Sequence, residues 1–337
     1  MATPVQHVTY MRYGDPADVI ELTPGSLPPP LPSEVQIAVK CCSLNPVDYK
    51  LMEGKFKAGP KGFPLRVGTD CSGVISAVGS QVSSLKVGDE VYCDAIFHGP
   101  LSTHVNVPSR IVSLKPPSLS YAEACTLPLA GLTALQGLRD LLKVGQPGSS
   151  RVLILGGSGG VGSLAIQMAK AMGAKRVATT STNEELCKSL GADAVVDYKK
   201  KSIEDSVSDI MNSESVKMDV IFDTVGGHEQ WKAAPAVLKK GGRFATIVGD
   251  GTGGFATIVG QVVWRKMFSR FGYDIFLTSS NSKDLDVLSQ FVAEGKLKPV
   301  IDDTVPVYPF TEAGVKEAFA KLKTGRCKGK LVIKVAD

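Results

Sequence analysis

The segment 156–162 reads GGSGGVG and places five glycines within seven positions. Glycine destabilises the interior of a helix or strand by roughly 0.5–1 kcal/mol relative to alanine, so a requirement other than local stability favours it here. Gly157, Gly159 and Gly162 have the spacing Gly-x-Gly-x-x-Gly. Between a strand and a helix, such glycines make a tight turn, admit a pyrophosphate close to the backbone and let the helix pack on the strand. The segment therefore predicts a dinucleotide-binding site.

The residues on either side of this glycine segment have the patterns that such a site requires. RVLIL at 151–155 is an apolar run typical of a central parallel strand, and SLAIQMAKAMG at 163–173 has apolar residues at helical spacing. The amino end of that helix would present free N–H groups and a partial positive charge to phosphates. We expect cofactor contacts from six residues of the loop: Gly157, Ser158, Gly159, Gly160, Val161 and Gly162.

The identity of the dinucleotide depends on the region about 20 residues further along, where an NAD site has an acidic residue that binds the ribose 2′-hydroxyl. Here that region reads ATTSTNEEL at 178–186. A hydroxyl group can donate to a 2′-phosphate, and no carboxylate stands at the strand end to repel it, so the sequence predicts NADPH. An alternative stays open, in which Ser181 or Thr182 caps the next helix and Glu184 or Glu185 completes a capping box.

Composition limits the classes of protein that the chain can belong to. Its 337 residues are 43% hydrophobic and 21% charged, which is typical of a globular protein large enough for two domains. The net charge is +5, and the Lys and Arg residues are dispersed without interleaved aromatics, so we expect no nucleic-acid partner. The apolar runs are shorter than the ~20 residues that span a bilayer, and the amino-terminal residues lack a signal-peptide pattern. We expect a cytoplasmic protein, with peripheral attachment to an organelle membrane as the alternative.

Cysteine and histidine spacing argues against a metal site. The seven cysteines are odd in number and contain no Cys-x-x-Cys pair, so neither a disulfide framework nor a structural zinc site is indicated. None of the four histidines pairs with a cysteine at ligand spacing. We therefore expect no bound metal.

The pattern of strand-like and helix-like segments changes along the chain. Residues 1–125 contain short β-like runs broken by Pro and Gly, which favour a small barrel or sandwich. In 126–275, strand-like and helix-like segments alternate, which predicts a parallel sheet covered by helices. Residues 276–337 contain two amphipathic helices and a final strand. The fold class is therefore α/β.

Six segments together resemble one known family. They are SLNPVDYKLMEG (43–54), VGTDCSGVISAVG (67–79), VGDEVY (87–92), PLAGLTALQGL (128–138), the glycine loop with its helix, and LGADAVVDY (190–198). In this order they resemble the medium-chain dehydrogenase/reductase superfamily, in particular its zinc-free quinone oxidoreductase and enone reductase branch. The resemblance implies a GroES-like β-rich substrate domain built from 1–125 and 276–337, a Rossmann domain with a doubly wound parallel sheet at 126–275, and a homodimer.

The chain departs from the zinc-dependent members of that superfamily at their metal positions. Those members carry a Cys in the first segment and Gly-His-Glu in the second, where this chain has Asn45-Pro46-Val47-Asp48 and Gly68-Thr69-Asp70. Reduction of an isolated ketone places full charge on one oxygen, which calls for a Lewis acid or a strong proton donor. A conjugated acceptor spreads the incoming charge. We therefore expect a metal-free NADPH-dependent reductase of quinones, enones or enals.

The resemblance also assigns roles to individual residues. Asn45 and Asp48 would lie beside the nicotinamide and shape the substrate pocket, and Tyr49 and Lys50 would assist protonation. Alternatively, Asn-Pro-x-Asp only forms a turn. Further cofactor contacts are implied for Thr133, Ser181, Tyr198, Val225, Gly226, Val248, Gly249 and Arg326.

A different class of function remains compatible with the same fold. A non-catalytic NADPH-binding sensor, or a membrane-associated structural protein, would keep the architecture and the cofactor site. Turnover of an acceptor distinguishes the enzyme from both.

Overall fold

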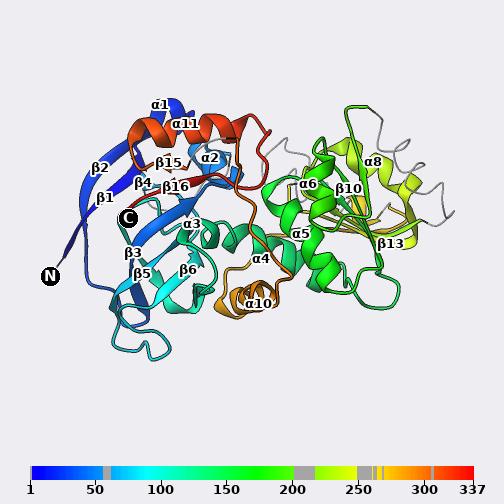
Figure 1. Ribbon diagram of the computed structural model, residues 1–337. Coiled ribbons are helices and arrows are strands. Elements are labelled where there is room, and N and C mark those ends of the chain that lie inside the picture. The colour runs from blue at the N-terminus through cyan, green and yellow to red at the C-terminus, as the bar shows by residue number, and fades with distance from the viewer. Residues whose placement is uncertain are drawn as a thin grey trace. The chain divides into compact units, whose positions relative to one another are not determined.

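The computed structural model describes residues 2–55, 62–200, 217–248, 260, 264–267, 269–304 and 307–337. The chain forms two compact units (Figure 1). The first contains Met1–Leu132, Ser279–Ala293 and Pro299–Asp337, and the second contains Thr133–Thr278 and Glu294–Lys298.

The unit boundaries differ from those expected from the sequence. The first unit extends seven residues past 125, into the helix α4 (Pro128–Gln136). Leu129 N donates to the buried Asp70 carboxylate at 2.8 Å, which attaches the start of this helix to the first unit. The stretch 294–298 returns to the second unit, where Gln167 bonds to both the N–H and the C=O of Lys298.

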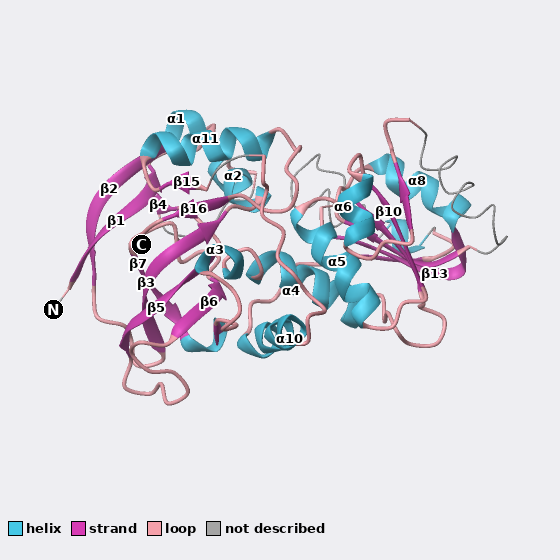
Figure 2. Cartoon of the chain, in the orientation of Figure 1, coloured by secondary structure: helices cyan, strands magenta, loops and turns pink. Residues whose placement is uncertain are grey.

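Strands dominate the first unit (Figure 2). One sheet has the order β2-β1-β4, and the other has the order β15-β16-β3-β5-β6-β8 with β7 on β3. The strands are β1 Thr3–Tyr10, β2 Ile20–Leu27, β3 Glu34–Ser43, β4 Leu65–Arg66, β5 Asp70–Val78, β6 Glu90–Asp94, β7 His104–Pro108, β8 Val112–Leu114, β15 Tyr308–Pro309 and β16 Val332–Lys334.

Alternation along β3 explains how this sheet closes over its core. Val35, Ile37 and Val39 occupy alternate positions and are buried together in one apolar cluster. The strand pairs with β5 and β7 on its two sides, and its carboxyl end pairs with β16, near the end of the chain. The final residues therefore complete a sheet that the first hundred residues begin, as the resemblance implied.

Short helices border the sheets of the first unit. They are α1 Pro16–Val19, α2 Pro46–Met52, α3 Tyr121–Ala124, α10 Ser282–Ala293 and α11 Glu312–Lys323, with a 3₁₀ turn at Ser109–Ile111. α11 begins at Thr311, whose side chain accepts from Gly314 N, and it packs against α1, α2 and β2. No helix among the described residues is long and apolar enough to cross a bilayer.

The second unit is built on a parallel sheet of six strands in the order β11-β10-β9-β12-β13-β14. The strands are β9 Arg151–Leu155, β10 Arg176–Thr180, β11 Ala194–Val196, β12 Met218–Asp223, β13 Leu238–Thr246 and β14 Gly272–Ile275. The predicted doubly wound sheet is confirmed. Strand order reverses between β9 and β12, and ligands of such sheets bind at the carboxyl ends beside this reversal.

Helices connect the strands of this sheet. α5 (Gly160–Ala171) packs against β9 and β10, α6 (Glu184–Ser189) packs against β11, and α8 (His228–Val237) packs against β12 and β13. A π-helical turn at Gly137–Leu141 extends α4. The glycine loop lies between β9 and α5, directly at the strand reversal.

Candidate functional site

Two of the three motif glycines are required by contacts inside the second unit. A Cβ on Gly157 would lie 2.1 Å from Thr179 Oγ1, in the neighbouring strand β10. A Cβ on Gly162 would lie 2.1 Å from Gly156 O, on the turn that leads into α5. Both distances are shorter than any carbon–oxygen contact, so these glycines allow the turn and the helix to pack against the sheet.

The third motif glycine has no such internal reason. Among the described residues other than its neighbours along the chain, a Cβ built on Gly159 would meet only Gly156 O, at 3.5 Å, which is an ordinary contact. Its φ of −79° is also accessible to any residue. The described residues thus leave room above Gly159 for the close backbone approach that a pyrophosphate makes to loops of this kind. The loop therefore fits the cofactor that its sequence predicts.

Gly159 is the N-cap of α5 and has no side chain with which to satisfy the first turn. The amides of Gly160 and Val161 open this helix, where N–H groups have no intrahelical acceptor. The helix dipole adds a partial positive charge at the same end. This end of α5 is suited to bind a phosphate group.

Thr180, at the end of β10, holds the loop in place and was missed by the sequence analysis. Its hydroxyl accepts from Gly156 N and its carbonyl accepts from Gly157 N, both at 3.0 Å. Gly156 itself has φ +87°, which favours glycine. The signal in the sequence is a threonine that ends the strand next to the loop.

Ser181 lies next to the glycine loop, as the predicted 2′-phosphate site requires. Its hydroxyl donates to Ser158 Oγ at 2.9 Å and accepts from Asn183 N at 2.9 Å. Asn183 caps α6, because its side chain accepts from Leu186 N. The alternative in which Ser181 or Thr182 caps this helix is therefore wrong, and the Ser181 hydroxyl is left to the loop.

A second turn lies beside the loop, after β12. Asp223 is buried, and its Oδ1 accepts from the amides of Val225 (3.0 Å) and Gly226 (2.9 Å). A Cβ on Gly156 would lie 2.8 Å from Val225 Cγ2, so this turn contacts the glycine loop. Val225 is 52% exposed, and Gly226 has φ +81°. Asp223, which the sequence analysis did not select, organises both predicted residues.

The remaining predicted cofactor residues are dispersed. Thr133 is buried in α4 and shares a 2.6 Å hydrogen bond with Thr278 Oγ1. Tyr198 follows β11 and is exposed, and Val248 N donates to Thr246 Oγ1 at the end of β13. Arg326 is exposed in a turn of the first unit. Gly249 lies outside the described residues.

In the first unit, Asn45 and Asp48 belong to a buried polar cluster at the start of α2. Asn45 is the N-cap of this helix, and its backbone N–H donates to Asp48 Oδ2 at 2.7 Å. The Asn45 side-chain amide donates to Thr69 Oγ1 at 2.6 Å and to Asp70 Oδ2 at 2.7 Å. The predicted turn is therefore present, and it also joins the two segments that hold the metal ligands in zinc-dependent relatives.

Asp48 keeps one unsatisfied oxygen inside this cluster. Its Oδ1 is buried without a hydrogen-bond partner among the described residues. Burial raises the pKa of Asp48 to about 7, against the opposing effect of its hydrogen bond from Asn45 N. Burial also raises the pKa of Asp94, opposite Asp70 on β6, to about 7. The Asp48 and Asp94 carboxyl groups therefore retain protons closer to neutral pH than exposed aspartates do.

Tyr49 and Lys50 follow Asp48 on α2 and differ in their surroundings. The Tyr49 ring packs against the apolar core, and burial raises the pKa of its hydroxyl. Lys50 is partly buried, and burial lowers the pKa of its ammonium group. The described residues provide no hydrogen-bond partner for Lys50 Nζ. Lys50 is therefore the better placed of the two to give up a proton.

Lys330, just before β16, enters the same cluster and was not predicted. Its ammonium group donates to Asn45 Oδ1, to Leu44 O at 2.9 Å and to Asp70 Oδ2 at 3.4 Å. It lies 285 residues from Asn45 along the chain. No local pattern in the sequence distinguishes it from the other lysines near the carboxyl terminus.

The donor set of this cluster does not fit a zinc ion. Zinc in proteins prefers cysteine sulfur and histidine nitrogen, whereas this cluster offers amide, hydroxyl and carboxylate oxygens beside an ammonium group. Among the described residues, no group of three or more His, Cys, Asp or Glu side chains is arranged to hold a metal.

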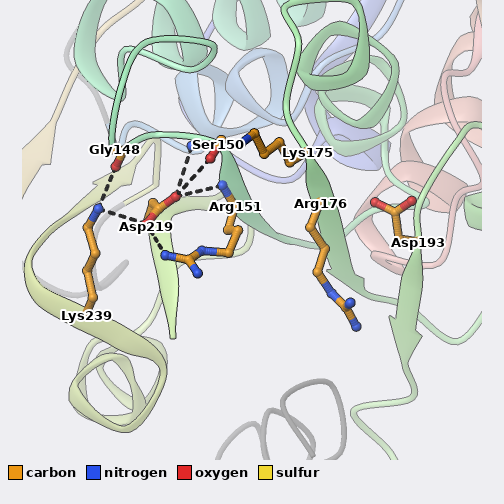
Figure 3. A pocket seen from close by; sticks show the side chains of 8 residues that line it. All are labelled: Gly148, Ser150, Arg151, Lys175, Arg176, Asp193, Asp219 and Lys239. Atoms are coloured by element: carbon orange, nitrogen blue, oxygen red, sulfur yellow. Dashed lines mark hydrogen bonds and ion pairs between the residues drawn. The ribbon is translucent and has the colours of Figure 1, made fainter. Parts of the chain in front are cut away.

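A hollow at the opposite, amino-terminal edge of the second unit's sheet serves the fold (Figure 3). Asp219, at the start of β12, accepts from Ser150 N (3.0 Å), Arg151 N (2.9 Å), Arg151 Nη2 (2.9 Å) and Lys239 Nζ (2.8 Å). These contacts join the starts of β9, β12 and β13. Both oxygens of this carboxylate accept from these neighbours, so Asp219 serves to hold the three strands together.

Comparisons with known proteins agree with the two kinds of fold described above. The profile of the alcohol dehydrogenase GroES-like domain matches residues 31–135, and that of zinc-binding dehydrogenases matches 190–333. A 2-methylene-furan-3-one reductase of Solanum lycopersicum is 40% identical over 96% of this chain and 78% of its own length. An NADPH-dependent alkenal/one oxidoreductase, chloroplastic, of Arabidopsis thaliana is 37% identical over the same shares. The quinone oxidoreductase of Coxiella burnetii superposes with a TM-score of 0.81 at 29% identity, over 99% of this chain and 100% of its own.

Proposed function

Because the chain belongs to the medium-chain dehydrogenase/reductase family, we propose that it is an NADPH-dependent oxidoreductase of conjugated acceptors, either quinones or α,β-unsaturated carbonyl compounds. The observation that carries the proposal is the open space above Gly159 at the strand reversal of a Rossmann sheet. The names of the tomato and Arabidopsis relatives, a furanone reductase and an alkenal/one oxidoreductase, favour the acceptor class.

Bound NADPH would supply a hydride equivalent. The glycine loop and the first turn of α5 would hold the pyrophosphate, and Ser181 and Tyr198 would bind the 2′-phosphate. Val225 and Gly226, in the turn that Asp223 organises, would position the ribose and nicotinamide. Thr133, Val248, Gly249 and Arg326 remain proposed cofactor contacts.

Hydride addition to the β-carbon of an enone leaves negative charge on an enolate, which is then protonated at the α-carbon. The conjugated system spreads this charge, so the reaction proceeds without a Lewis acid. Asn45 and Asp48 would shape the acceptor site, and Lys50 would donate the proton, because burial lowers the pKa of its ammonium group. The internal ammonium of Lys330 in the polar cluster supports the metal-free proposal.

The cofactor proposal is tested with two alanine variants of one loop. We expect Gly159→Ala to fold as stably as wild type, since its Cβ meets only ordinary contacts, and to bind NADPH at least about tenfold more weakly in calorimetry. Gly162→Ala is the matched control that should lower thermal stability, because its Cβ would overlap Gly156 O. Wild-type affinity in a folded Gly159→Ala protein would contradict the proposal.

The acceptor proposal is tested by turnover. We expect NADPH oxidation with enones, enals or quinones and negligible rates with saturated ketones. Preferential turnover of saturated ketones or alcohols would overturn the metal-free reductase. NADPH binding without turnover of any acceptor would instead favour the non-catalytic sensor.

Two further proposals concern the whole protein. We propose a homodimer, for which β14 offers an edge, since among the described residues this strand pairs only with β13. The compartment stays a prediction: the sequence predicts the cytoplasm, whereas the name of the Arabidopsis relative assigns that protein to the chloroplast.

A further inference from the structure

Lys330 carries one of the most deeply buried cations of the first unit. Its side chain is 6% exposed, and that of Asp70 is 0% exposed. The three N–H donors of its ammonium group meet three acceptors: Leu44 O, Asn45 Oδ1 and Asp70 Oδ2. A buried charge is tolerated only when it is paired and hydrogen-bonded in this way. The Lys330 side chain is therefore held in place by hydrogen bonds to the three acceptors around it.

The Lys330 contact determines how the Asn45 side chain is oriented. An ammonium group only donates, so it selects the oxygen of the carboxamide and turns the NH₂ group toward Thr69 and Asp70. Both N–H groups of Asn45 are then used inside the cluster. The Asp70 carboxylate, which only accepts, favours the same orientation, and Lys330 adds the donor that the Asn45 oxygen needs.

Lys330 also places a positive charge beside the buried carboxyl groups of the cluster. Asp70 and Asp94 are directly opposite each other on β5 and β6, and Asp48 lies on α2 beside them. Of these three carboxyl groups, Asp70 contacts the Lys330 ammonium group directly, at 3.4 Å.

We propose that Lys330 is the internal cation of this cluster: it positions the Asn45 carboxamide and takes up the acceptors that a metal ion would need. The positioning part rests on the proposed function, in which Asn45 shapes the acceptor site. The charge-balancing part depends only on the fold. Lys330 is thus a positioning residue that acts through Asn45.

The first experiment measures stability and needs no activity. We expect Lys330→Met to lower the thermal midpoint by about 5 °C or more, because it leaves buried Asp70 without its cation. Adding Asp70→Asn should recover at least half of that loss. The matched control is Lys328→Met, which removes an exposed charge two residues away and should behave as wild type. A Lys330→Met variant as stable as wild type, or no recovery in the double variant, overturns the charge pairing.

The second experiment separates positioning from stability. In the Lys330→Met/Asp70→Asn double variant the charges again balance, but Asn45 Oδ1 has lost its donor. We expect the NADPH Kd to stay within about twofold of wild type, while kcat/KM for the acceptor falls about tenfold or more. Wild-type kcat/KM in the folded double variant would overturn the positioning role.

The third experiment concerns the metal. Wild-type protein dialysed against Zn²⁺ or Mn²⁺ should retain no more metal than protein dialysed without it. Stoichiometric metal that is lost on Asp70→Asn substitution would overturn the inference. If no acceptor is reduced by wild type, the proposed function fails, while the stability and metal measurements still report on Lys330.

Discussion

At the scale of single residues, hydrogen bonds inside the protein decide which side chains remain available for chemistry. Asn45 has the residue type of a substrate-binding amide, yet both of its N–H groups donate to neighbours. The Ser181 hydroxyl likewise has partners in the protein, since it donates to Ser158 Oγ of the glycine loop and accepts from Asn183 N. Residue type suggests a role, and the partners of the side chain limit it.

Asp48 should make stability depend on pH in a definite direction. Its pKa is raised to about 7 in the folded protein, mainly by burial, so the folded state retains a proton that the unfolded state loses near pH 4. Stability therefore falls as pH rises from 4 to 7. We expect Asp48→Asn to gain stability relative to wild type over this range, by up to about 4 kcal/mol. Urea unfolding at pH 4 and pH 7 measures the free energy of unfolding of both proteins. If the variant differed from wild type by the same amount at both pH values, the raised pKa of Asp48 would be refuted.

Ser181 should decide between the two nicotinamide cofactors. Ser181→Ala removes the hydroxyl proposed to bind the 2′-phosphate, so NADPH binding should weaken about tenfold while NADH binding stays the same. Ser189→Ala, which removes an exposed hydroxyl at the end of α6, is the control. Equal loss of affinity for both cofactors would show that Ser181 supports the glycine loop and does not bind the 2′-phosphate.

At the scale of elements, polar side chains join strands at both edges of the parallel sheet. At the carboxyl edge, Thr180 and Asp223 bond to the backbone of the two turns in which we propose the cofactor site. At the amino edge, Asp219 holds β9, β12 and β13 together (Figure 3). The carboxyl edge thus carries the two turns of the proposed cofactor site, whereas the strands at the amino edge are joined to one another by the Asp219 carboxylate.

The Asp219 cluster should contribute measurably to stability. Donors from Arg151, Lys239 and Ser150 outweigh burial, the largest single effect, and lower the pKa of Asp219 to about 2. Its contribution is therefore present above about pH 4 and is lost as the pH falls toward 2. We expect Asp219→Asn to lose about 2 kcal/mol at pH 7 and progressively less below pH 4.

The matched control for Asp219 is Asp274→Asn, since Asp274 forms an exposed ion pair with Lys266. This variant should change the free energy of unfolding by less than about 1 kcal/mol. If Asp219→Asn lost the same amount at pH 2.5 and pH 7, the carboxylate charge would not be the source of the effect.

At the scale of the whole molecule, each unit contains one group of proposed site residues. The glycine loop belongs to the second unit, and the polar cluster around Asn45 belongs to the first. Each unit combines distant parts of the chain, since β16 completes a sheet with β3 and 294–298 returns to the Rossmann unit.

The proposed homodimer belongs to this scale. An exposed edge strand such as β14 presents free backbone groups that a second copy can bond. We expect light scattering at about 10 μM protein to give twice the mass of one chain, as an interface of ordinary affinity predicts. A monomer mass at tenfold higher concentration would contradict the proposal.

Much of the fold followed from the sequence, whereas the predicted site residues remain a proposal. Glycine spacing, apolar alternation and the order of segments are local patterns, because tight turns and helix or strand periodicity depend on near neighbours. They were enough to predict the β-rich first unit, the doubly wound sheet and the loop between β9 and α5. Thr180 was within reach of the same reasoning, as a threonine ending the adjacent strand.

Only the tertiary structure decided which charged groups meet. Lys330 and Asn45 are 285 residues apart, and the pairing of β16 with β3 brings them together. The pKa of Asp48 depends on burial, which no stretch of sequence specifies. Periodicity is encoded within a few residues, whereas contacts, desolvation and charge balance arise from the packing of the complete chain.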